Sequence, residues 1–209
     1  MSKLILASAS PRRRELLEQA GYSFDVQPAH INEDSRPGED PIAYVTRLAR
    51  EKAECVWRDT ASSEAIVLGA DTTVVVDGKM LAKPADAEDA RRMLRLLSGR
   101  THRVITGVAV ARGAEGLLGT DSGREAAPFV EVAAEVTAVR FLALSDDEID
   151  AYIATGEPMD KAGGYAIQGQ AARWIPRIEG CYFNVVGLPL ALVSTMLGNS
   201  KPRPLSGTE

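Results

Sequence analysis

The order of strand-like and helical segments is the feature that most constrains the fold of this chain of 209 residues. In the first half, short apolar runs of strand length alternate with stretches whose apolar residues recur at helical spacing. Further along, the runs at 103–112 and 129–141 are both strand-like, with no helical stretch between them. Alternation favours parallel strands joined by helices, whereas consecutive strands favour antiparallel pairing. The sequence therefore predicts an α/β fold with a mixed central sheet flanked by helices.

Local signals place the individual helices and strands. Ser10 is a predicted N-cap, and Ser145 with Glu148 is a predicted capping box. Helices are expected over 11–21, 41–58, 86–99 and 145–156, and from about 189. The run at 3–7 is typical of a buried strand, and 65–78 is interpreted as a strand, a Gly-Ala-Asp-Thr junction and a second strand. In this interpretation, Asp71 stands at the end of the first of these two strands.

Charge and cysteine content exclude several classes of protein. The formal net charge is −5, whereas proteins that coat nucleic acid or anionic membranes need a basic surface. No apolar run approaches membrane-spanning length, and the first residues do not form a signal peptide. Cys55 and Cys181 are the only cysteines and form no C-x-x-C pair, which argues against a disulfide framework or a thiolate zinc site. We therefore expect a cytoplasmic protein that binds neither nucleic acid nor membrane.

Length and composition predict one folded domain. With 209 residues, of which 45% are hydrophobic, the chain is long enough for one sizeable core. Residues 1–199 are assigned to this domain, and residues 200–209 to a flexible C-terminal tail. The glycine-rich stretch 113–128 is expected to be a solvated loop.

Three consecutive arginines stand in the first turn of the first predicted helix. The helix dipole already places positive charge at this end, so Arg12 and Arg13 destabilise the helix unless an anion binds there. The strand-loop-helix junction directs backbone N–H groups at such an anion, and guanidinium groups match phosphate oxygens in pairs. We interpret Arg12 and Arg13 as ligands of a polyphosphate, and Arg14 as a solvated residue that pairs with Glu15 or Glu18. The alternative, that all three lie on a solvated face, stays open at this point.

A carboxylate and two lysines are further candidates for chemistry. Asp71 stands where ligands usually bind in α/β sheets, although it would also serve as a turn cap. Lys52 projects among apolar helix positions and, like Lys83, is ambiguous, since a lysine stem can simply cover an apolar surface. With two histidines and no H-E-x-x-H sequence, a metal would be held by carboxylates and phosphate, which favours Mg²⁺ or Mn²⁺. Glu33 and Asp71 are the predicted metal ligands.

Six short motifs occur in a fixed order along nearly the whole chain. They are S-A-S-P-R-R at Ser8–Arg13, L-A-R-E-K-A at Leu48–Ala53, G-A-D-T at Gly69–Thr72, L-A-K-P at Leu81–Pro84, L-S-G-R-T-H at Leu97–His102 and G-E-P-M-D-K-A-G-G-Y-A-I-Q-G at Gly156–Gly169. In order and spacing, this set closely resembles the Maf family of nucleoside triphosphate pyrophosphatases. Residues 113–128 exceed the short loop expected from the resemblance and are not covered by it.

The resemblance implies an inosine-triphosphatase-like fold with two lobes around a cleft, and often a homodimer. Members of this family hydrolyse nucleoside triphosphates between the α and β phosphates, giving the monophosphate and pyrophosphate, with a divalent metal. Asp71 matches the family's proton acceptor, and we assign Lys52 and Lys83 to the catalytic set as countercharges for the phosphates. The residues expected to bind substrate are Ser8, Arg12, Arg13, Thr72, Lys161 and Gln168.

The choice of base is expected to depend on Gln168. The sequence D-K-A-G-G-Y-A-I-Q-G looks like the branch of the family that acts on dTTP and UTP rather than the branch that takes 7-methyl-GTP. A primary amide offers a donor and an acceptor that complement the N3–H and 4-oxo groups of uracil and thymine. The alternative for Gln168 is that its amide satisfies backbone groups of its own loop. The alternative for the whole protein is a non-catalytic nucleotide-binding regulator of septum formation in cell division.

Overall fold

The computed structural model describes residues 3–60, 64–113 and 127–198. Its strands are β1 (Leu4–Leu6), β2 (Phe24–Val26), β3 (Ile66–Val76), β4 (Lys79–Leu81), β5 (Thr101–Arg112), β6 (Phe129–Arg140) and β7 (Arg177–Glu179). Its α-helices are α1 (Pro11–Gln19), α2 (Pro41–Asp59), α3 (Ala87–Leu97), α5 (Asp146–Ala154), α6 (Tyr182–Val186) and α7 (Leu190–Leu197), and its 3₁₀ helices are η1 (Glu157–Asp160), η2 (Ala162–Gly164) and η3 (Gln170–Trp174). The tail predicted at 200–209 and most of the loop predicted at 113–128 lie outside the described residues.

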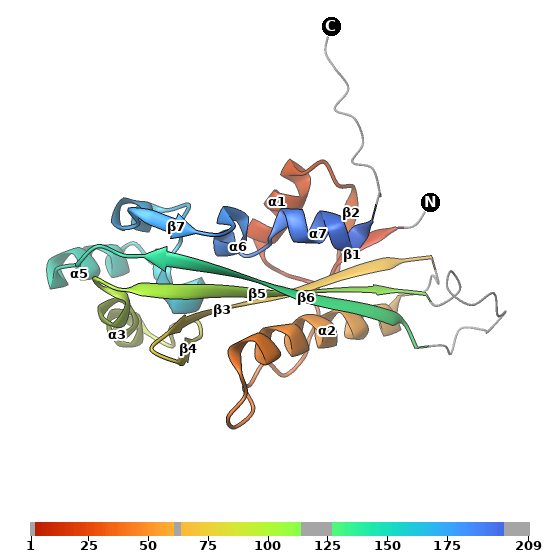
Figure 1. Cartoon of the computed structure of the whole chain (residues 1–209), viewed down its shortest axis with the longest axis horizontal. Coiled ribbons are helices and arrows are strands. Elements are labelled where there is room, and N and C mark those ends of the chain that lie inside the picture. Colours follow the sequence, from red (N-terminus) through yellow and green to blue (C-terminus); the bar gives the residue numbers. More distant parts are fainter. Residues whose placement is uncertain (1–2, 61–63, 114–126, 199–209) are drawn as a thin grey trace, which may run out of the picture. The chain divides into compact units, whose positions relative to one another are not determined.

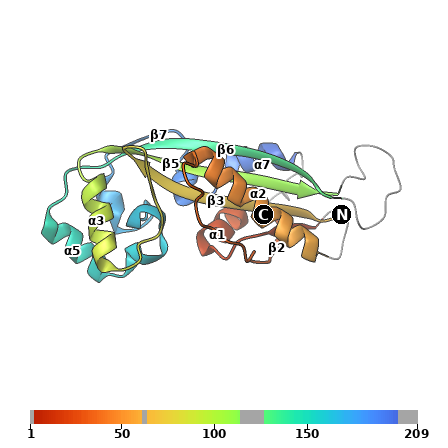
Figure 2. The ribbon, with the colours of Figure 1, turned by 90° about the horizontal axis from the view of Figure 1, so that it is seen from below.

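The strands form one mixed sheet, as the sequence predicts. Its order is β2-β1-β3-β5-β6-β7, with β4 paired to β3 off this path (Figure 1, and Figure 2 from below). β1 pairs in parallel with β2 and with β3, whereas β3 with β4 and β6 with β7 are antiparallel pairs. The prediction of an α/β fold with a mixed central sheet flanked by helices is therefore confirmed.

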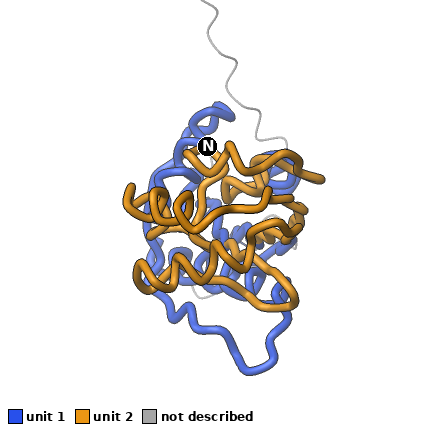
Figure 3. Tube along the Cα trace, turned by 90° about the vertical axis from the view of Figure 1, so that its left-hand side faces the viewer, with its two compact units in different colours: residues 1–71, 107–134, 190–209 blue, residues 72–106, 135–189 orange. Residues whose placement is uncertain are grey.

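The chain divides into two compact units. Unit 1 comprises residues 1–71, 107–134 and 190–209, and unit 2 comprises residues 72–106 and 135–189 (Figure 3). β3, β5 and β6 each begin in one unit and end in the other. The division in β3 falls between Asp71 and Thr72, so these two neighbouring residues belong to different units.

In unit 1, α2 packs directly on the sheet because two glycines lie beneath it. A Cβ atom on Gly69 of β3 would lie 2.2 Å from the carbonyl oxygen of Ala49, and one on Gly107 of β5 would lie 2.3 Å from that of Val45. Only a residue without a side chain allows the helix backbone so close. Small buried residues of α2 and the strands, such as Ala53 and Ala109, complete this contact. In Figure 1, α2 lies below these strands, and α1 and α7 lie above them.

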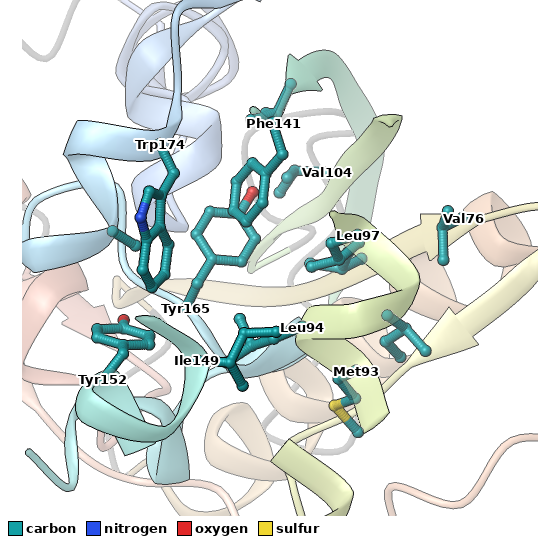
Figure 4. Close-up of a cluster of buried hydrophobic side chains, with 14 residues drawn as sticks. Val76, Met93, Leu94, Leu97, Val104, Phe141, Ile149, Tyr152, Tyr165 and Trp174 are labelled. Atoms are coloured by element: carbon teal, nitrogen blue, oxygen red, sulfur yellow. The ribbon is translucent and has the colours of Figure 1, made fainter. Parts of the chain in front are cut away.

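In unit 2, the core is built around aromatic side chains. The ring centroid of Phe141 lies 4.8 Å from that of Tyr165 and 6.5 Å from that of Trp174, and Trp174 meets the buried ring of Tyr152 at 5.1 Å (Figure 4). α3 packs against α5 and contributes apolar residues such as Leu94 to the same cluster. This core supports the loops that carry the last of the six motifs.

The helix starts agree with the local signals, but one strand prediction is wrong. Ser10 accepts a hydrogen bond from the N–H of Arg13, and Ser145 with Glu148 forms a complete capping box. Residues 66–76 form a single strand, β3, instead of two strands with a junction. Asp71 therefore lies inside a continuous strand. Gly69 lacks a side chain so that α2 can approach, but its backbone stays part of the strand. No helix in the described part of the chain is both long and apolar enough to span a membrane.

Candidate active site

A buried lysine–aspartate pair is the centre of the site. Lys52, on the sheet-facing side of α2, donates a hydrogen bond from Nζ to Oδ1 of Asp71 in β3 at 2.7 Å. The two side chains are only 9% and 11% exposed. A buried ammonium and a buried carboxylate are each costly unless they are paired, so this contact fixes both groups. The prediction that Lys52 projects among the apolar positions of its helix is confirmed.

Glu33 joins this pair from the loop that precedes α2. Its Oε1 atom lies 2.8 Å from Nζ of Lys52, so one ammonium bridges Glu33 and Asp71. The Glu33 side chain is 53% exposed, in contrast to its two neighbours. Tyr44 of α2 donates a hydrogen bond from its hydroxyl to the carbonyl oxygen of Glu33 at 2.9 Å. The structure therefore brings three predicted site residues together, with Glu33 on the solvent side.

A second ion pair holds the same loop against α2, and the sequence analysis missed it. The guanidinium of Arg47 donates from Nε to Oε1 of Glu39 at 2.6 Å and from Nη2 to Oε2 at 2.8 Å. It also donates to the carbonyl oxygen of Asp34 at 3.1 Å. This two-pronged contact lowers the pKa of Glu39 to about 2, chiefly through the hydrogen bond from Arg47. Arg47 falls on the polar side of the helix in the sequence pattern, and no local signal shows that a loop covers it.

The N-terminal arginines separate as the sequence suggests. Arg13 turns back toward the strands and donates from Nη1 to the carbonyl oxygen of Ala70 at 2.8 Å and to Oγ of Ser8 at 3.2 Å. Burial lowers the pKa of Arg13, and the charge of Asp71 opposes that change. Arg12 is half-buried beside it. Arg14 is exposed and pairs with Glu18 at 3.9 Å, as predicted for a solvated position.

The electrostatics of Asp71 suit a proton acceptor. Burial raises the pKa of this carboxyl, and the charges of Lys52 and Arg13 and the hydrogen bond from Lys52 act in the opposite direction. A carboxylate whose pKa is raised is a better base than an exposed one, since catalytic pKa values near the working pH favour proton transfer. Arg13 binds the carbonyl oxygen of Ala70, the residue before Asp71. The Asp71 carboxylate therefore lies near a second cation, the Arg13 guanidinium, in addition to Lys52.

The predicted residues of unit 2 gather around two neighbouring loops. The N–H of Gly163 donates to the carbonyl oxygen of Ala82 at 3.0 Å, which joins the segment of Lys83 to that of Lys161. Lys83 is exposed, whereas the Lys161 side chain is 14% exposed and donates from Nζ to the carbonyl oxygen of Glu157 at 2.7 Å. Unit 2 therefore places these two cations on adjoining segments.

Thr72 and Gln168 differ in how tightly they are held. Oγ1 of Thr72 lies 2.9 Å from Oγ1 of the fully buried Thr106. Gln168 is exposed, and its amide has no hydrogen-bond partner among the residues that the structure describes. The structure therefore contradicts the alternative in which the Gln168 amide binds backbone groups of its own loop. The residues that do hold this loop, Tyr152 and Glu157, were not singled out from the sequence.

Fold and site together define an α/β enzyme that acts on a phosphorylated ligand: a buried carboxylate is paired with an ammonium, and Arg13 lies beside it at a helix start. The chain belongs to the Maf family, since the family model described as Maf-like protein matches residues 3–200.

Curated relatives cover nearly the whole chain. A protein of Chromobacterium violaceum is 49% identical over 199 residues, which are 94% of this chain and 93% of its own. A protein of Anaeromyxobacter dehalogenans is 52% identical over 196 residues, 93% of this chain and 92% of its own, and one of Moorella thermoacetica is 50% identical over 197 residues, 94% of each chain. All three relatives are named dTTP/UTP pyrophosphatase. The resemblance found from the six motifs is confirmed.

Proposed function

We propose that this protein is a nucleoside triphosphate pyrophosphatase that hydrolyses dTTP and UTP to the monophosphate and pyrophosphate. The observation that carries the proposal is the buried pair of Lys52 and Asp71, with a carboxyl whose pKa is raised by burial. Relatives that are named dTTP/UTP pyrophosphatase and are about half identical in sequence support the same activity.

The chemistry assigned to these residues needs charge neutralisation more than a covalent intermediate. Asp71 accepts a proton from water as the water oxygen forms its bond to phosphorus, and the P–O bond that breaks between the α and β phosphates releases pyrophosphate. Arg12 and Arg13 bind the phosphate oxygens, and Lys52 holds the carboxylate in place. Ser8, Lys83 and Lys161 complete the proposed set of substrate contacts.

The donor set at Asp71 fits a divalent metal with oxygen ligands. Glu33 and Asp71 converge on one ammonium, 2.8 and 2.7 Å from their carboxylates, so two hard oxygen donors are already close together. Within residues 3–60, 64–113 and 127–198, no group of three His, Cys, Asp or Glu side chains is arranged to hold a metal. Such a site suits Mg²⁺ or Mn²⁺, which take few carboxylates and complete their coordination with water and substrate phosphate. The bound ion would supply positive charge to the phosphates and to the attacking water.

Gln168 is proposed to select the base. Its exposed amide is without a partner in the described chain and can pair with the 4-oxo and N3–H groups of uracil or thymine. Cytosine presents its donor and acceptor in the opposite order, so pairing with it leaves polar groups unsatisfied. A homodimer, a cytoplasmic location and a partner in cell division stay predictions for this chain.

A nucleotide panel tests this proposal. Purified protein is incubated with dTTP, UTP, CTP, ATP and GTP in the presence of Mg²⁺ or Mn²⁺, and pyrophosphate is measured. We expect turnover of dTTP and UTP above the others. We also expect Gln168→Ala to lower kcat/KM for these two nucleotides by about 10- to 100-fold, from about 1–3 kcal/mol of lost hydrogen bonding. Tight nucleotide binding with no release of pyrophosphate would contradict the proposal and favour a non-catalytic regulator.

A further inference from the structure

Glu157 and Tyr152, joined by a hydrogen bond, together hold both ends of the segment that carries Gln168. Glu157 accepts a hydrogen bond at Oε1 from the Tyr152 hydroxyl at 2.7 Å and one at Oε2 from the N–H of Gln170 at 3.3 Å. The Tyr152 oxygen in turn accepts a hydrogen bond from the N–H of Ala166 at 3.2 Å. Ala166 and Gln170 stand two residues before and two residues after Gln168. The main chain is therefore fixed on either side of the predicted base-recognition residue.

The carboxylate fits closely into this segment. A Cβ atom on Gly169 would lie 2.0 Å from Oε1 of Glu157, so the glycine leaves the space that the carboxylate fills. On the other side, the Tyr152 ring is fully buried and stacks edge-on with Trp174 in the core of unit 2 (Figure 4). Burial raises the pKa of the Tyr152 hydroxyl, which therefore remains a donor to Glu157. The segment is thus joined to a rigid part of its own unit.

The same residue also contacts a second predicted substrate ligand. The main-chain carbonyl of Glu157 accepts the hydrogen bond from Nζ of Lys161 at 2.7 Å. Its side chain, by contrast, makes hydrogen bonds, within the described part of the chain, only to the segment around Gln168 and to the Tyr152 hydroxyl. A substitution that changes the side chain alone therefore leaves the carbonyl contact to Lys161 in place.

We propose that Glu157, together with Tyr152, is a positioning residue for recognition of the base. An amide discriminates between UTP and CTP only if its orientation is fixed, because a rotated amide presents its donor and acceptor in the order that suits cytosine. Hydrogen bonds on both sides of Gln168 fix the backbone from which the side chain extends, and so restrict the positions and directions from which its amide can reach the base. This inference rests on the proposed function, in which Gln168 contacts the base.

The direct test is Glu157→Gln, which keeps the size of the side chain. A glutamine has an NH₂ group in place of one carboxylate oxygen, whereas the Tyr152 hydroxyl and the Gln170 N–H each need an oxygen acceptor, so one of these two hydrogen bonds is lost and the segment is held less firmly. We expect the ratio of kcat/KM for UTP to that for CTP to fall about 5- to 10-fold, while kcat for saturating UTP changes less than about threefold. Tyr152→Phe removes the link to Ala166 and is expected to lower the same ratio, which provides a second variant if the first fails to fold.

Glu148→Gln is the matched control. Glu148 also belongs to unit 2 and accepts hydrogen bonds from Ser145 and, at 3.3 Å, from Nε1 of Trp174. Its contacts do not include the segment around Gln168. We expect this variant to lose thermal stability without a change in the UTP to CTP ratio.

The decisive measurement adds Glu157→Gln to Gln168→Ala. If Glu157 acts through Gln168, the double variant has the same nucleotide ratio as Gln168→Ala alone. Equal losses of kcat/KM for UTP and CTP in Glu157→Gln, or effects on the ratio that multiply in the double variant, would overturn the inference and leave the proposed function intact. An unchanged ratio in Gln168→Ala itself would instead refute the role of Gln168 in base recognition, and the inference with it.

Discussion

Gly69 sets the distance between α2 and β3, and Gly69→Ala is therefore a test of how the site is assembled. The added Cβ atom would lie 2.2 Å from the carbonyl oxygen of Ala49, whereas ordinary contacts begin at 3.4 Å. The added Cβ atom is fixed rigidly to the backbone of β3, and the oxygen belongs to the backbone of α2, so neither atom can move aside alone. The helix must therefore move away from the strand by about 1 Å. Overpacking of this kind costs about 1–3 kcal/mol of stability.

The displacement reaches the proposed catalytic pair of Lys52 and Asp71 because α2 carries Lys52. The hydrogen bond from Lys52 to Asp71 is 2.7 Å long. A lift of about 1 Å takes it beyond the range of about 3.2 Å in which such bonds form. Misplacement of a catalytic group by this distance can lower activity by about 100-fold. We therefore expect kcat/KM for UTP to fall by roughly that factor in the folded variant.

The assay combines urea unfolding with pyrophosphate release by Gly69→Ala, with Gly78→Ala as the control. Gly78 has a φ of +75° and no neighbour within 4 Å of an added Cβ atom. Its alanine variant is expected to lose about 1–2 kcal/mol through backbone strain alone, with normal activity per folded molecule. If Gly69→Ala keeps kcat/KM within twofold of the wild type and is no less stable than Gly78→Ala, the inference that Gly69 sets the distance between α2 and β3 is refuted.

Three further substitutions test the site and the core. Asp71→Asn is expected to lower kcat by about 100- to 10,000-fold with an unchanged fold, and near-normal kcat would contradict its role as proton acceptor. Glu33→Gln is expected to raise the Mg²⁺ or Mn²⁺ concentration needed for half-maximal activity, and activity should vanish with EDTA; full activity in excess EDTA would contradict the metal assignment. Burial lowers the pKa of His102 to about 4, below the ordinary value of 6.5. As the pH falls, the unfolded chain therefore takes up a proton before the folded chain does, and the free energy of unfolding is expected to decrease by about 1.6 kcal/mol between pH 6.5 and pH 5. His102→Gln should remove that part of the pH dependence, and an unchanged pH dependence in urea unfolding would show that His102 does not cause it.

Helix starts and the place of Lys52 on an apolar helix face could be predicted because their signals are local. Ser10 and Ser145 form the caps that their side chains suggest. Lys52 interrupts an apolar helix face, and a charged side chain at such a position must find a partner when it is buried. Asp71 is a candidate from its place in a strand and from the family motif, but neither signal shows that Lys52 is the residue that pairs with it.

The remaining features depend on contacts between distant parts of the chain. β2, β4 and β7 have three residues each, too few to show a period, and they form because a longer strand lies beside them. Gly69 resembles a strand break until the approach of α2 is known. Arg47 belongs to the polar side of its helix by spacing, but its side chain is only 14% exposed because the loop before α2 covers it.

The interleaving of the two units has a consequence for biosynthesis. The chain passes between the units at residues 71/72, 106/107, 134/135 and 189/190. A ribosome that has translated residue 189 has supplied every residue of unit 2, but not α7, whose Met196 carbonyl accepts a hydrogen bond from Arg112 in unit 1. Unit 1, which holds Lys52 and Asp71, therefore cannot be completed until α7 leaves the ribosome. Termination of translation before α7 would therefore leave the unit that holds Lys52 and Asp71 as the unfinished one.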